Sequence, residues 1–387
     1  MILFVGITLL NFSTNKDNLD FSEFYGAAQM VRQGHGKDLY DLDLQAEFQS
    51  RVAAVHAVYL RPPFETLLFV PLTYVSYRTA YTLWTLANVA FLALAAFLIE
   101  SRTGIALAIA QYTRIRADWG LILVIFLTFA PTTTCLLLGQ DSILMLLIYV
   151  SVFVLMREGA DFRAGCLLAC GLFKFHLVVP FAAILLFRRK WAALGGFAAI
   201  ASGLVVLSVA ISGPRILREY PRVLFFDSTH RQMMGFHPDF TPNIHGFLYL
   251  IAKNVLSASL LGCLVALFSL LALCWAAKNW RNDRFGFSFS GSLVATLLAS
   301  YHLYNYDLVL VLLPVAVVCG ELAQSGHLLS GTPLLTSTLL ALFVPPVHFV
   351  LVTNGIYALM FVPILLLFFV IVRLNRADSP DERTVHT

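Results

Sequence analysis

The sequence predicts an all-α, polytopic membrane protein with roughly ten to twelve transmembrane helices. Of its 387 residues, 59% are hydrophobic and only 12% are charged, whereas about 25% of the residues of an ordinary soluble domain are charged. The mean hydropathy is +0.80. A helix needs about 20 apolar residues to cross a bilayer, and uncharged stretches of about that length occur at 79–99, 119–140, 191–214, 254–277 and 349–372.

The chain opens with a short apolar segment, MILFVGITLLNFS. About a dozen apolar residues are too few to span a bilayer. The segment has neither the basic start nor the small-residue cleavage site of a signal peptide. We therefore expect residues 1–13 to form the outer part of a first membrane helix.

A polar segment, residues 14–63, follows this short helix. It predicts an amphipathic helix that lies on the membrane surface and ends at the glycines of the GHG sequence. A second helical piece is predicted over 42–58. The apolar face of the first helix recurs at helical spacing, with Phe21, Phe24, Tyr25, Ala28 and Val31.

Arginines and lysines gather in short loops between the apolar stretches, as the positive-inside rule expects of cytoplasmic loops. Residues 14–63 and 213–245 then form extracytoplasmic loops of a single membrane domain, 1–376. This topology requires 164–187 to be a broken hairpin or 64–76 to be re-entrant. A disordered cytoplasmic tail is predicted at the C-terminus, over 377–387. The remaining apolar stretches, each interrupted, are 142–156, 164–187, 285–306, 308–320 and 328–347.

The charge and cysteine content excludes several classes of function. The net charge is only +4, and no basic tract resembles a nucleic-acid-binding arm, so no nucleic-acid partner is expected. All six cysteines fall in apolar runs, and none has the spacing of a zinc or redox pair. No cofactor is expected from the sequence, although a requirement for a divalent metal stays open.

Ionisable groups in or beside apolar stretches are candidate functional residues, because they are costly to place in a membrane. Asp20 with Glu23 has the spacing of a helix capping box, and the same carboxylate could act in catalysis. Lys174, with His176 in GLFKFH, interrupts an apolar run and needs a partner, for which an anionic phosphate is suitable.

Two further polar groups stand out between the later apolar stretches. SYHLYNYDLVL, which begins at Ser300, contains His302, Tyr306 and Asp307; an ordinary turn is the alternative interpretation. The loop 226–246 carries several histidines, and a substrate-covering loop is a better prediction for it than a metal site.

Taken together, these segments resemble glycosyltransferase family 87, whose members are integral membrane enzymes of the GT-C fold. The resemblance covers about residues 15–320 and rests on the order of degenerate motifs. Two positions differ from the usual pattern: Asp141 stands where Asn is common and Phe175 where Pro is common. The motifs are DFSEFYGAAQMVRQGHGKDLYD, YLRPPFETLLFVPL, GQDS, GLFKFH, TPNIHGFLYL and SYHLYNYDLVL.

The resemblance implies a hexosyltransferase of the bacterial inner (plasma) membrane, most simply a mannosyltransferase. Its donor would be a polyprenyl-phosphate sugar and its acceptor an envelope lipid or glycan on the extracytoplasmic face. Asp20 would be the general base, and Lys174, His176 and His302 would contact the donor or its phosphate. The expected substrate-binding residues are Glu23, Tyr25, Gln140, Asp141, Asn243, Tyr306 and Asp307.

Two alternatives remain open from the sequence. A secondary transporter would also have broken helices and intramembrane charges, but the chain has no internal repeat and a long polar first loop without an obvious role in transport. A lipid-linked glycan ligase or polymerase is also polytopic, but that class usually depends on a large late loop. Glycosyl transfer from a donor would distinguish a glycosyltransferase from a transporter, which moves its substrate without covalent change.

Overall fold

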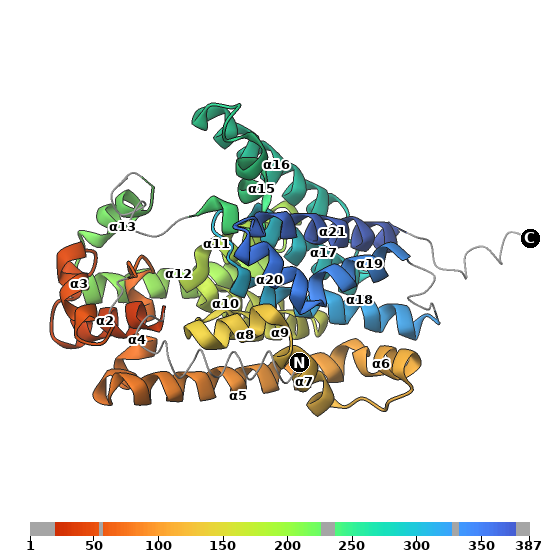
Figure 1. The fold of residues 1–387 in the computed structure, drawn as a ribbon, viewed down its shortest axis with the longest axis horizontal. Coiled ribbons are helices and arrows are strands. Elements are labelled where there is room, and N and C mark those ends of the chain that lie inside the picture. Colours follow the sequence, from red (N-terminus) through yellow and green to blue (C-terminus); the bar gives the residue numbers. More distant parts are fainter. Residues whose placement is uncertain (1–19, 54–56, 226–236, 327–332, 377–387) are drawn as a thin grey trace, which may run out of the picture.

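The computed structural model describes residues 20–53, 57–225, 237–326 and 333–376. Within these ranges every secondary-structure element is a helix, which confirms the all-α prediction (Figure 1). The predicted membrane segment at 1–13 and the predicted tail at 377–387 lie outside the described residues.

The α-helices before residue 213 are α2 (Phe21–Arg32), α3 (Leu42–Ser50), α4 (Thr66–Phe69), α5 (Tyr77–Thr103), α6 (Ile105–Thr113), α7 (Trp119–Leu127), α8 (Ala130–Leu138), α9 (Ser142–Arg157), α10 (Asp161–Cys170), α11 (Phe175–Phe187) and α12 (Trp191–Ser212). Those that follow are α13 (Ile216–Phe225), α15 (Ile244–Ala252), α16 (Ala258–Lys278), α17 (Phe285–Ala299), α18 (Leu312–Gln324), α19 (Pro333–Phe343), α20 (Pro345–Thr353) and α21 (Phe361–Arg376). The 3₁₀ helices are η1 (Gly36–Asp38), η2 (Pro63–Glu65), η3 (Val70–Tyr74), η4 (Gly171–Lys174), η5 (Pro238–Phe240), η6 (Asn305–Val311) and η8 (Tyr357–Met360).

The structure supports a multi-pass membrane protein. Among the described residues, six helices are long and apolar enough to cross a bilayer, or eight if two bent helix pairs each count as one span. Two shorter apolar helices, α9 and α17, accompany them. The number of spans therefore reaches the lower end of the expected ten to twelve only if both bent pairs and both shorter helices cross the bilayer.

Two uncharged stretches are not the straight spans that hydropathy predicts. The stretch 119–140 is divided into α7 and α8, which meet at an angle of 73°. Pro131, in the first turn of α8, has no backbone N–H to continue a preceding helix. In the stretch 349–372, α20 ends at Thr353, two residues before Gly355 in the left-handed conformation (φ 66°), and the next span begins only at Tyr357.

The structure also bears on the two topological alternatives from the sequence, a broken hairpin at 164–187 and a re-entrant segment at 64–76. Residues 161–187 form one candidate span rather than a broken hairpin, with the 3₁₀ turn η4 inside it. Residues 63–74 form only the short helices η2, α4 and η3, which together are too short to cross a bilayer.

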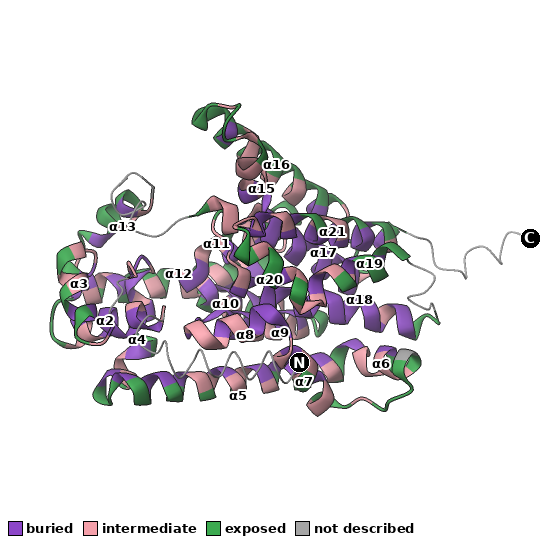
Figure 2. Cartoon of the chain, viewed as in Figure 1, coloured by how far each residue is buried: buried purple, intermediate pink, exposed green. Residues whose placement is uncertain are grey.

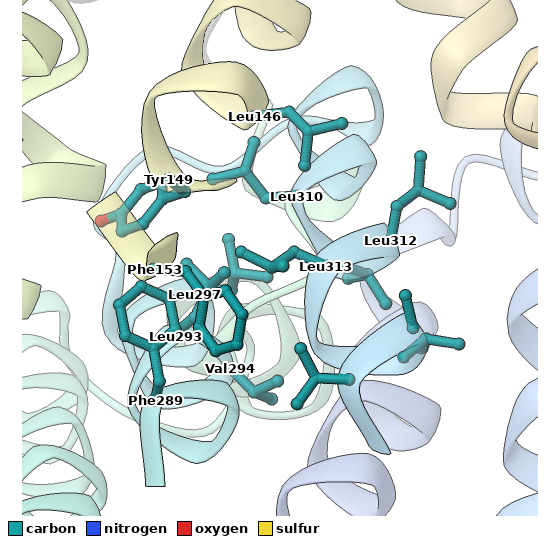
Figure 3. Close-up of a cluster of buried hydrophobic side chains, with 14 of the residues drawn as sticks. Leu146, Tyr149, Phe153, Phe289, Leu293, Val294, Leu297, Leu310, Leu312 and Leu313 are labelled. Atoms are coloured by element: carbon teal, nitrogen blue, oxygen red, sulfur yellow. The ribbon is translucent and has the colours of Figure 1, made fainter. Parts of the chain in front are cut away.

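The hydrophobic core lies where α9, α17 and the helix of residues 305–324 pack together (Figure 3). Phe153, Phe289, Leu293 and Leu310 are almost completely buried there. Residues 305–324 are buried along nearly their whole length, whereas α12 and α16 expose most of their side chains (Figure 2). Since the exposed side chains of α12 and α16 are mainly apolar, lipid is the solvent that suits them.

The first loop forms a compact unit at one end of the molecule (Figure 1). Helix α2 begins where the sequence predicts, but its apolar face packs against the protein instead of lying on the membrane surface. Phe24 stacks on Phe69 at 4.8 Å between ring centroids, and Phe21 contacts Tyr81 of α5 at 5.6 Å. This packing of aromatic rings fixes the start of α2, and therefore Asp20, against the membrane helices.

Candidate functional site

A cavity of about 380 Å³ lies where the first loop meets the ends of several membrane helices. Its walls come from the first loop, the end of α8, η4 with the start of α11, and the segment 301–306. The later loop contributes His237 and Phe240. A cavity of this size can hold a small ligand group, and its polar groups come from parts of the chain that are distant in sequence.

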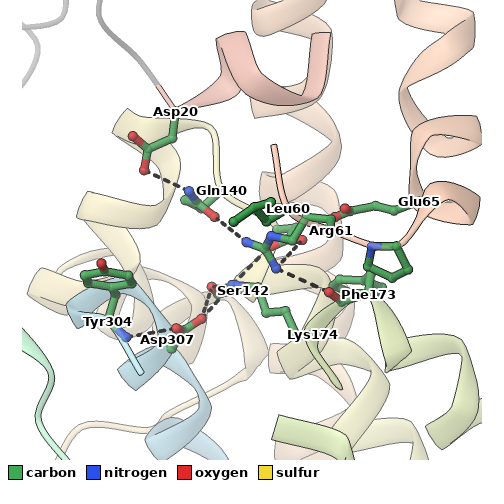
Figure 4. Close-up of polar contacts among 12 residues, drawn as sticks. Asp20, Leu60, Arg61, Glu65, Gln140, Ser142, Phe173, Lys174, Tyr304 and Asp307 are labelled. Carbon is green, nitrogen blue, oxygen red and sulfur yellow. Dashed lines mark hydrogen bonds and ion pairs between the residues drawn. The ribbon is translucent and has the colours of Figure 1, made fainter. Parts of the chain in front are cut away.

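Asp20 lines this cavity and does not cap its helix. Its side chain makes no capping hydrogen bond, so the capping-box interpretation is wrong. Instead its carboxylate accepts a hydrogen bond of 2.8 Å from the amide nitrogen of Gln140 (Figure 4). Burial raises the pKa of Asp20 above its ordinary value, and Gln140 and Arg61 partly offset this increase. A carboxylate with a raised pKa is a better proton acceptor than one in water.

Gln140 is positioned by the end of helix α8. Gly139 ends this helix in the left-handed conformation (φ 69°), and a side chain there would collide with Phe21. The indole nitrogen of Trp84 donates to the carbonyl of Gly139 at 2.9 Å, and the hydroxyl of Tyr81 donates to the carbonyls of Leu136 and Leu137, each at 2.9 Å. Side chains of α5 thus satisfy the helix-end carbonyls, which would otherwise be left unpaired.

Arg61 is the cation on the cavity wall, and the sequence-based selection missed it. Its guanidinium donates to the side-chain oxygen of Gln140 and to the carbonyl of Phe173, both at 3.4 Å, and lies 3.7 Å from Asp141. These distances exceed those of strong hydrogen bonds. A loosely held guanidinium in a cavity can turn to an incoming anion and bind it with two N–H groups.

Lys174 lies beneath the cavity and is completely buried. Its ammonium is 2.6 Å from Asp307 and 2.9 Å from Asp141, and it donates to the hydroxyl of Ser142 at 2.7 Å (Figure 4). Asp307 also accepts from Ser142 and from the backbone of Tyr304. The partners of the buried lysine are thus two carboxylates of the protein, and the group holds together α9, η4 and η6.

Two histidines also line the cavity. His176 and His302 lie 5.6 Å apart between ring centroids. Burial and the neighbouring Arg61 lower the pKa of His302 to about 3, so its imidazole is neutral at physiological pH. The Nε2 atom of His176 is buried without a hydrogen-bond partner among the described residues. Neutral imidazoles can donate or accept hydrogen bonds toward a ligand.

The structure separates the sequence-selected residues into three groups. Those that line the cavity are Asp20, Glu23, Gln140, His176, His302 and Tyr306. Lys174, Asp141 and Asp307 form the buried ionic group beneath it. Tyr25 and Asn243 are elsewhere: the Tyr25 hydroxyl donates to the carbonyl of Val75, and Asn243 caps α15 and donates to the carbonyl of Ser300.

Glu65 is a second buried group that the sequence-based selection did not include. It is almost fully buried and accepts a hydrogen bond of 3.2 Å from the hydroxyl of Tyr59. Burial raises the pKa of Glu65 well above its ordinary value. Both Glu65 and Arg61 flank the Pro-Pro pair at the start of an apolar run. The sequence does contain a signal for Arg61 and Glu65. They are two charged residues at a helix start, beside uncharged stretches, where charge is costly.

The later loop and its histidines give no metal centre in the described part of the chain. His230 falls outside the described residues. In the described ranges, no three His, Cys, Asp or Glu side chains lie close enough together to hold a metal ion. His237 instead lines the cavity, while Asp239 forms an ion pair with Lys253 at 3.1 Å.

Glu23 gives a testable dependence of stability on pH. Burial raises its pKa from 4.5 to about 8. Between these values the folded state holds a proton that the unfolded state has released, so stability falls as pH rises through this window. A shift of this size corresponds to at most about 5 kcal/mol. Because Glu23 is only partly buried and solvent screens its charge, we expect the free energy of unfolding to fall by on the order of 1–3 kcal/mol across this pH window, and by less in Glu23→Gln. Thermal unfolding of purified protein at several pH values measures both.

The matched control for Glu23 is Glu47→Gln, because Glu47 is an exposed residue of the same loop that pairs with Arg51. This change should leave the pH dependence as it is in the wild type. Equal pH dependence in wild type and Glu23→Gln would show that Glu23 is already ionised in the folded protein.

The cavity therefore contains the groups needed to move a proton and to bind an anion. Asp20 can accept the proton, while Arg61 and the two histidines can hold negative charge or polar groups. Gln140 contacts both Asp20 and Arg61, so one amide side chain separates the proton acceptor from the cation.

Comparison with known proteins gives one match. The model of glycosyltransferase family 87 matches residues 59–300, which is more than half of the chain. No curated protein and no solved structure matches the chain.

Proposed function

Because the chain belongs to glycosyltransferase family 87 and is a multi-pass membrane glycosyltransferase, we propose that it transfers a hexose, in the first place mannose, from a polyprenyl-phosphate donor. The acceptor would be a lipid or glycan of the bacterial envelope, and the enzyme would act in the inner membrane. The observation that carries this proposal is the placement of a partly buried carboxylate, Asp20, and a loosely held cation, Arg61, on the walls of one cavity.

The reaction divides between these two groups. Asp20 takes the proton of the acceptor hydroxyl while the oxygen attacks C1 of the sugar. The bond between C1 and the phosphate oxygen breaks, and polyprenyl phosphate leaves with the bonding electron pair. Arg61 holds the negative charge of the leaving phosphate, and His176 or His302 donates a hydrogen bond to the donor. A displacement in one step inverts the configuration at C1.

The buried ionic group supports the proposal indirectly. Arg61 and Lys174 bring two positive charges, and Asp141 and Asp307 bring two negative charges. Lys174 is fully engaged at 2.6–2.9 Å, whereas the contacts of Arg61 are longer. Arg61 is therefore the cation that binds the incoming phosphate. Lys174 holds Asp141 in place beside Arg61.

The direct test is an assay of sugar transfer from labelled polyprenyl-phosphate mannose in membranes that contain the protein. Label that appears in a new lipid or glycan product supports the proposal. If the mannose donor is inactive, the corresponding glucose and arabinose donors are tested next. A labelled compound that crosses sealed vesicles without covalent change would instead indicate a transporter.

Arg61→Gln is expected to lower kcat/KM for the donor by about 10- to 1000-fold, because removal of one group that stabilises developing charge has effects of this size. The glutamine keeps hydrogen-bonding capacity but loses the charge. Arg61→Lys should recover part of the activity, since a lysine restores the charge without the two-pronged geometry. Initial rates at several donor concentrations measure the effect.

The control for Arg61 is Arg51→Gln. Arg51 belongs to the same loop, is exposed and pairs with Glu47, so its replacement should leave donor kinetics unchanged. Wild-type kinetics in Arg61→Gln would assign the binding of the leaving phosphate to another group.

A further inference from the structure

A second cavity, separate from the one above, opens on the lipid-facing side of the bundle between α16 and α21. It is a groove of about 770 Å³ whose walls come from α15, α16, α17 and α21. Phe268, Leu271 and Phe369 on its walls are about 40–50% exposed. Its lining is apolar along most of its length, and it ends at two basic residues, Lys278 and Arg376.

The basic end of the groove is held in a fixed arrangement. Lys278 is the last residue of α16, and Arg376 is the last residue of α21. Arg376 Nε donates to the side-chain oxygen of Asn279 at 2.5 Å, and the amide of Asn375 donates to the carbonyl of Asn279, also at 2.5 Å. These bonds join the two helix ends and bring both cations to the same end of the groove.

The two cations are not neutralised by acidic residues in the described part of the chain. No carboxylate described there lies within 4.0 Å of Lys278 or Arg376, whereas the nearby Arg281 pairs with Asp283 at 2.6 Å. Only one N–H group of Arg376 is used by Asn279, and a guanidinium has five. The end of the groove therefore presents positive charge and hydrogen-bond donors toward a ligand.

This basic end is far from the catalytic cavity. Helix α17 begins at the basic end, where the side chain of Arg284 donates to the carbonyl of Leu374 in α21. It ends just before Tyr301 and His302, which line the cavity. A helix of this length, Phe285–Ala299, measures roughly 22 Å. A donor whose phosphate lies beside Arg61 cannot also place that phosphate beside Lys278.

We propose that this groove binds an anionic phospholipid, with the headgroup phosphate between Lys278 and Arg376 and an acyl chain along α16 and α21. An apolar groove that opens to the hydrocarbon of the bilayer is suited to an acyl chain. The charges at its end select the headgroup, because basic residues between membrane helices attract anionic lipids. A zwitterionic lipid brings its own ammonium group and is attracted less.

The native tryptophan of the groove allows a direct binding experiment. Trp275 lines the groove, and its fluorescence is quenched by lipids with brominated acyl chains. The full chain is placed in nanodiscs with increasing fractions of brominated phosphatidylglycerol or brominated phosphatidylcholine. Subtracting the signal of Trp275→Phe isolates the contribution of Trp275. We expect half-maximal quenching at a clearly lower fraction of phosphatidylglycerol than of phosphatidylcholine.

Variants then test the two parts of the site. Lys278→Gln or Arg376→Gln should each weaken quenching by phosphatidylglycerol about fivefold, the contribution typical of one basic residue at a membrane surface. Arg373→Gln is the matched control, because Arg373 is an exposed basic residue one turn earlier on α21 that does not line the groove. Ala272→Phe, which fills the groove wall, should reduce quenching by both lipids.

Three results would overturn the proposal. Equal quenching by the two lipids in the wild type would remove the selection by charge. A loss in Arg373→Gln as large as in Lys278→Gln would show a general surface effect. Displacement of phosphatidylglycerol by polyprenyl phosphate would assign the groove to the chain of the sugar donor. Because the readout is lipid binding, the outcome does not depend on whether the protein transfers a sugar, and a failure of this proposal is distinguishable from a failure of the proposed function.

Discussion

Replacement of Asp20 by asparagine is expected to lower the rate of sugar transfer by about 10²- to 10⁴-fold, the usual contribution of a general base. Asparagine has nearly the same shape as aspartate, and its side-chain oxygen can still accept the hydrogen bond from Gln140. Because Asp20 does not cap α2, the change removes no helix cap. Transfer from the labelled donor, normalised to the amount of folded protein, measures the effect.

Asp41→Asn is the control for this experiment. Asp41 lies in the same loop and caps α3 through the backbone N–H of Leu44, a role that asparagine fills equally well. Its replacement should leave transfer unchanged. If Asp20→Asn transfers sugar at the wild-type rate, the base is another carboxylate, and Glu23 on the same cavity wall becomes the next candidate.

Lys174→Met is expected to lower the free energy of unfolding by about 3–5 kcal/mol, the cost of leaving a buried ion pair without one partner. Methionine keeps the length of the side chain, but Asp141 and Asp307 lose the ammonium between them. Thermal unfolding of purified protein measures the loss. If Lys174→Met cannot be purified, Lys174→Arg, which keeps the charge, should be purified with a smaller loss.

Two further variants distinguish a structural role of Lys174 from binding of the donor. Asp307→Asn in the Lys174→Met background should recover part of the stability, because it removes one of the unpaired charges. Lys190→Met is the control: Lys190 forms a half-buried pair with Asp161 at 3.6 Å, and such pairs contribute about 1 kcal/mol or less. A Lys174→Met protein that is as stable as the wild type but has a raised KM for the donor would assign the lysine to the donor site.

The helical class of the chain could be predicted from hydropathy alone, but the shape of the individual helices could not. An uncharged stretch such as 119–140 satisfies any count of apolar residues, yet Pro131 divides it into two helices that meet at 73°. The composition of a segment determines how unfavourable it would be to expose that segment to water. It does not determine the direction of the helix in the membrane, which depends on proline, on the carbonyls at helix ends and on the side chains that bind those carbonyls.

The candidate site, like the fold, could be predicted from the sequence only in part. The periodicity of residues 21–31 predicted the apolar face with Phe21 and Phe24, although not that this face packs against the protein. Asp20, proposed from the sequence as a base or a helix cap, lines the cavity and makes no side-chain capping bond. The cost of a buried charge predicted that Lys174 must have a partner. It could not predict that Asp141 and Asp307 are those partners, because each pairing depends on how distant helices pack.

Arg61 was missed for a physical reason. An arginine at the boundary of an apolar stretch is usually explained by extension of its long side chain to the membrane surface. Here the chain turns at Pro62 and Pro63, and the side chain points into the cavity toward Gln140 (Figure 4). The guanidinium also lies over the ring of Phe24 in α2, 5.6 Å from the ring centroid, and contacts between such distant segments cannot be read from local sequence.

The buried ionic group also has a consequence for how the protein is made. Lys174 and Asp307 are 133 residues apart. At a synthesis rate of about 5–20 residues per second, the ribosome needs on the order of ten seconds to reach the aspartate after the lysine. During that interval the nascent chain holds an incompletely neutralised ammonium in the membrane. The early helices therefore reach their final assembly only after the late ones emerge, and biogenesis factors that shelter unfinished helices have a defined period in which to act.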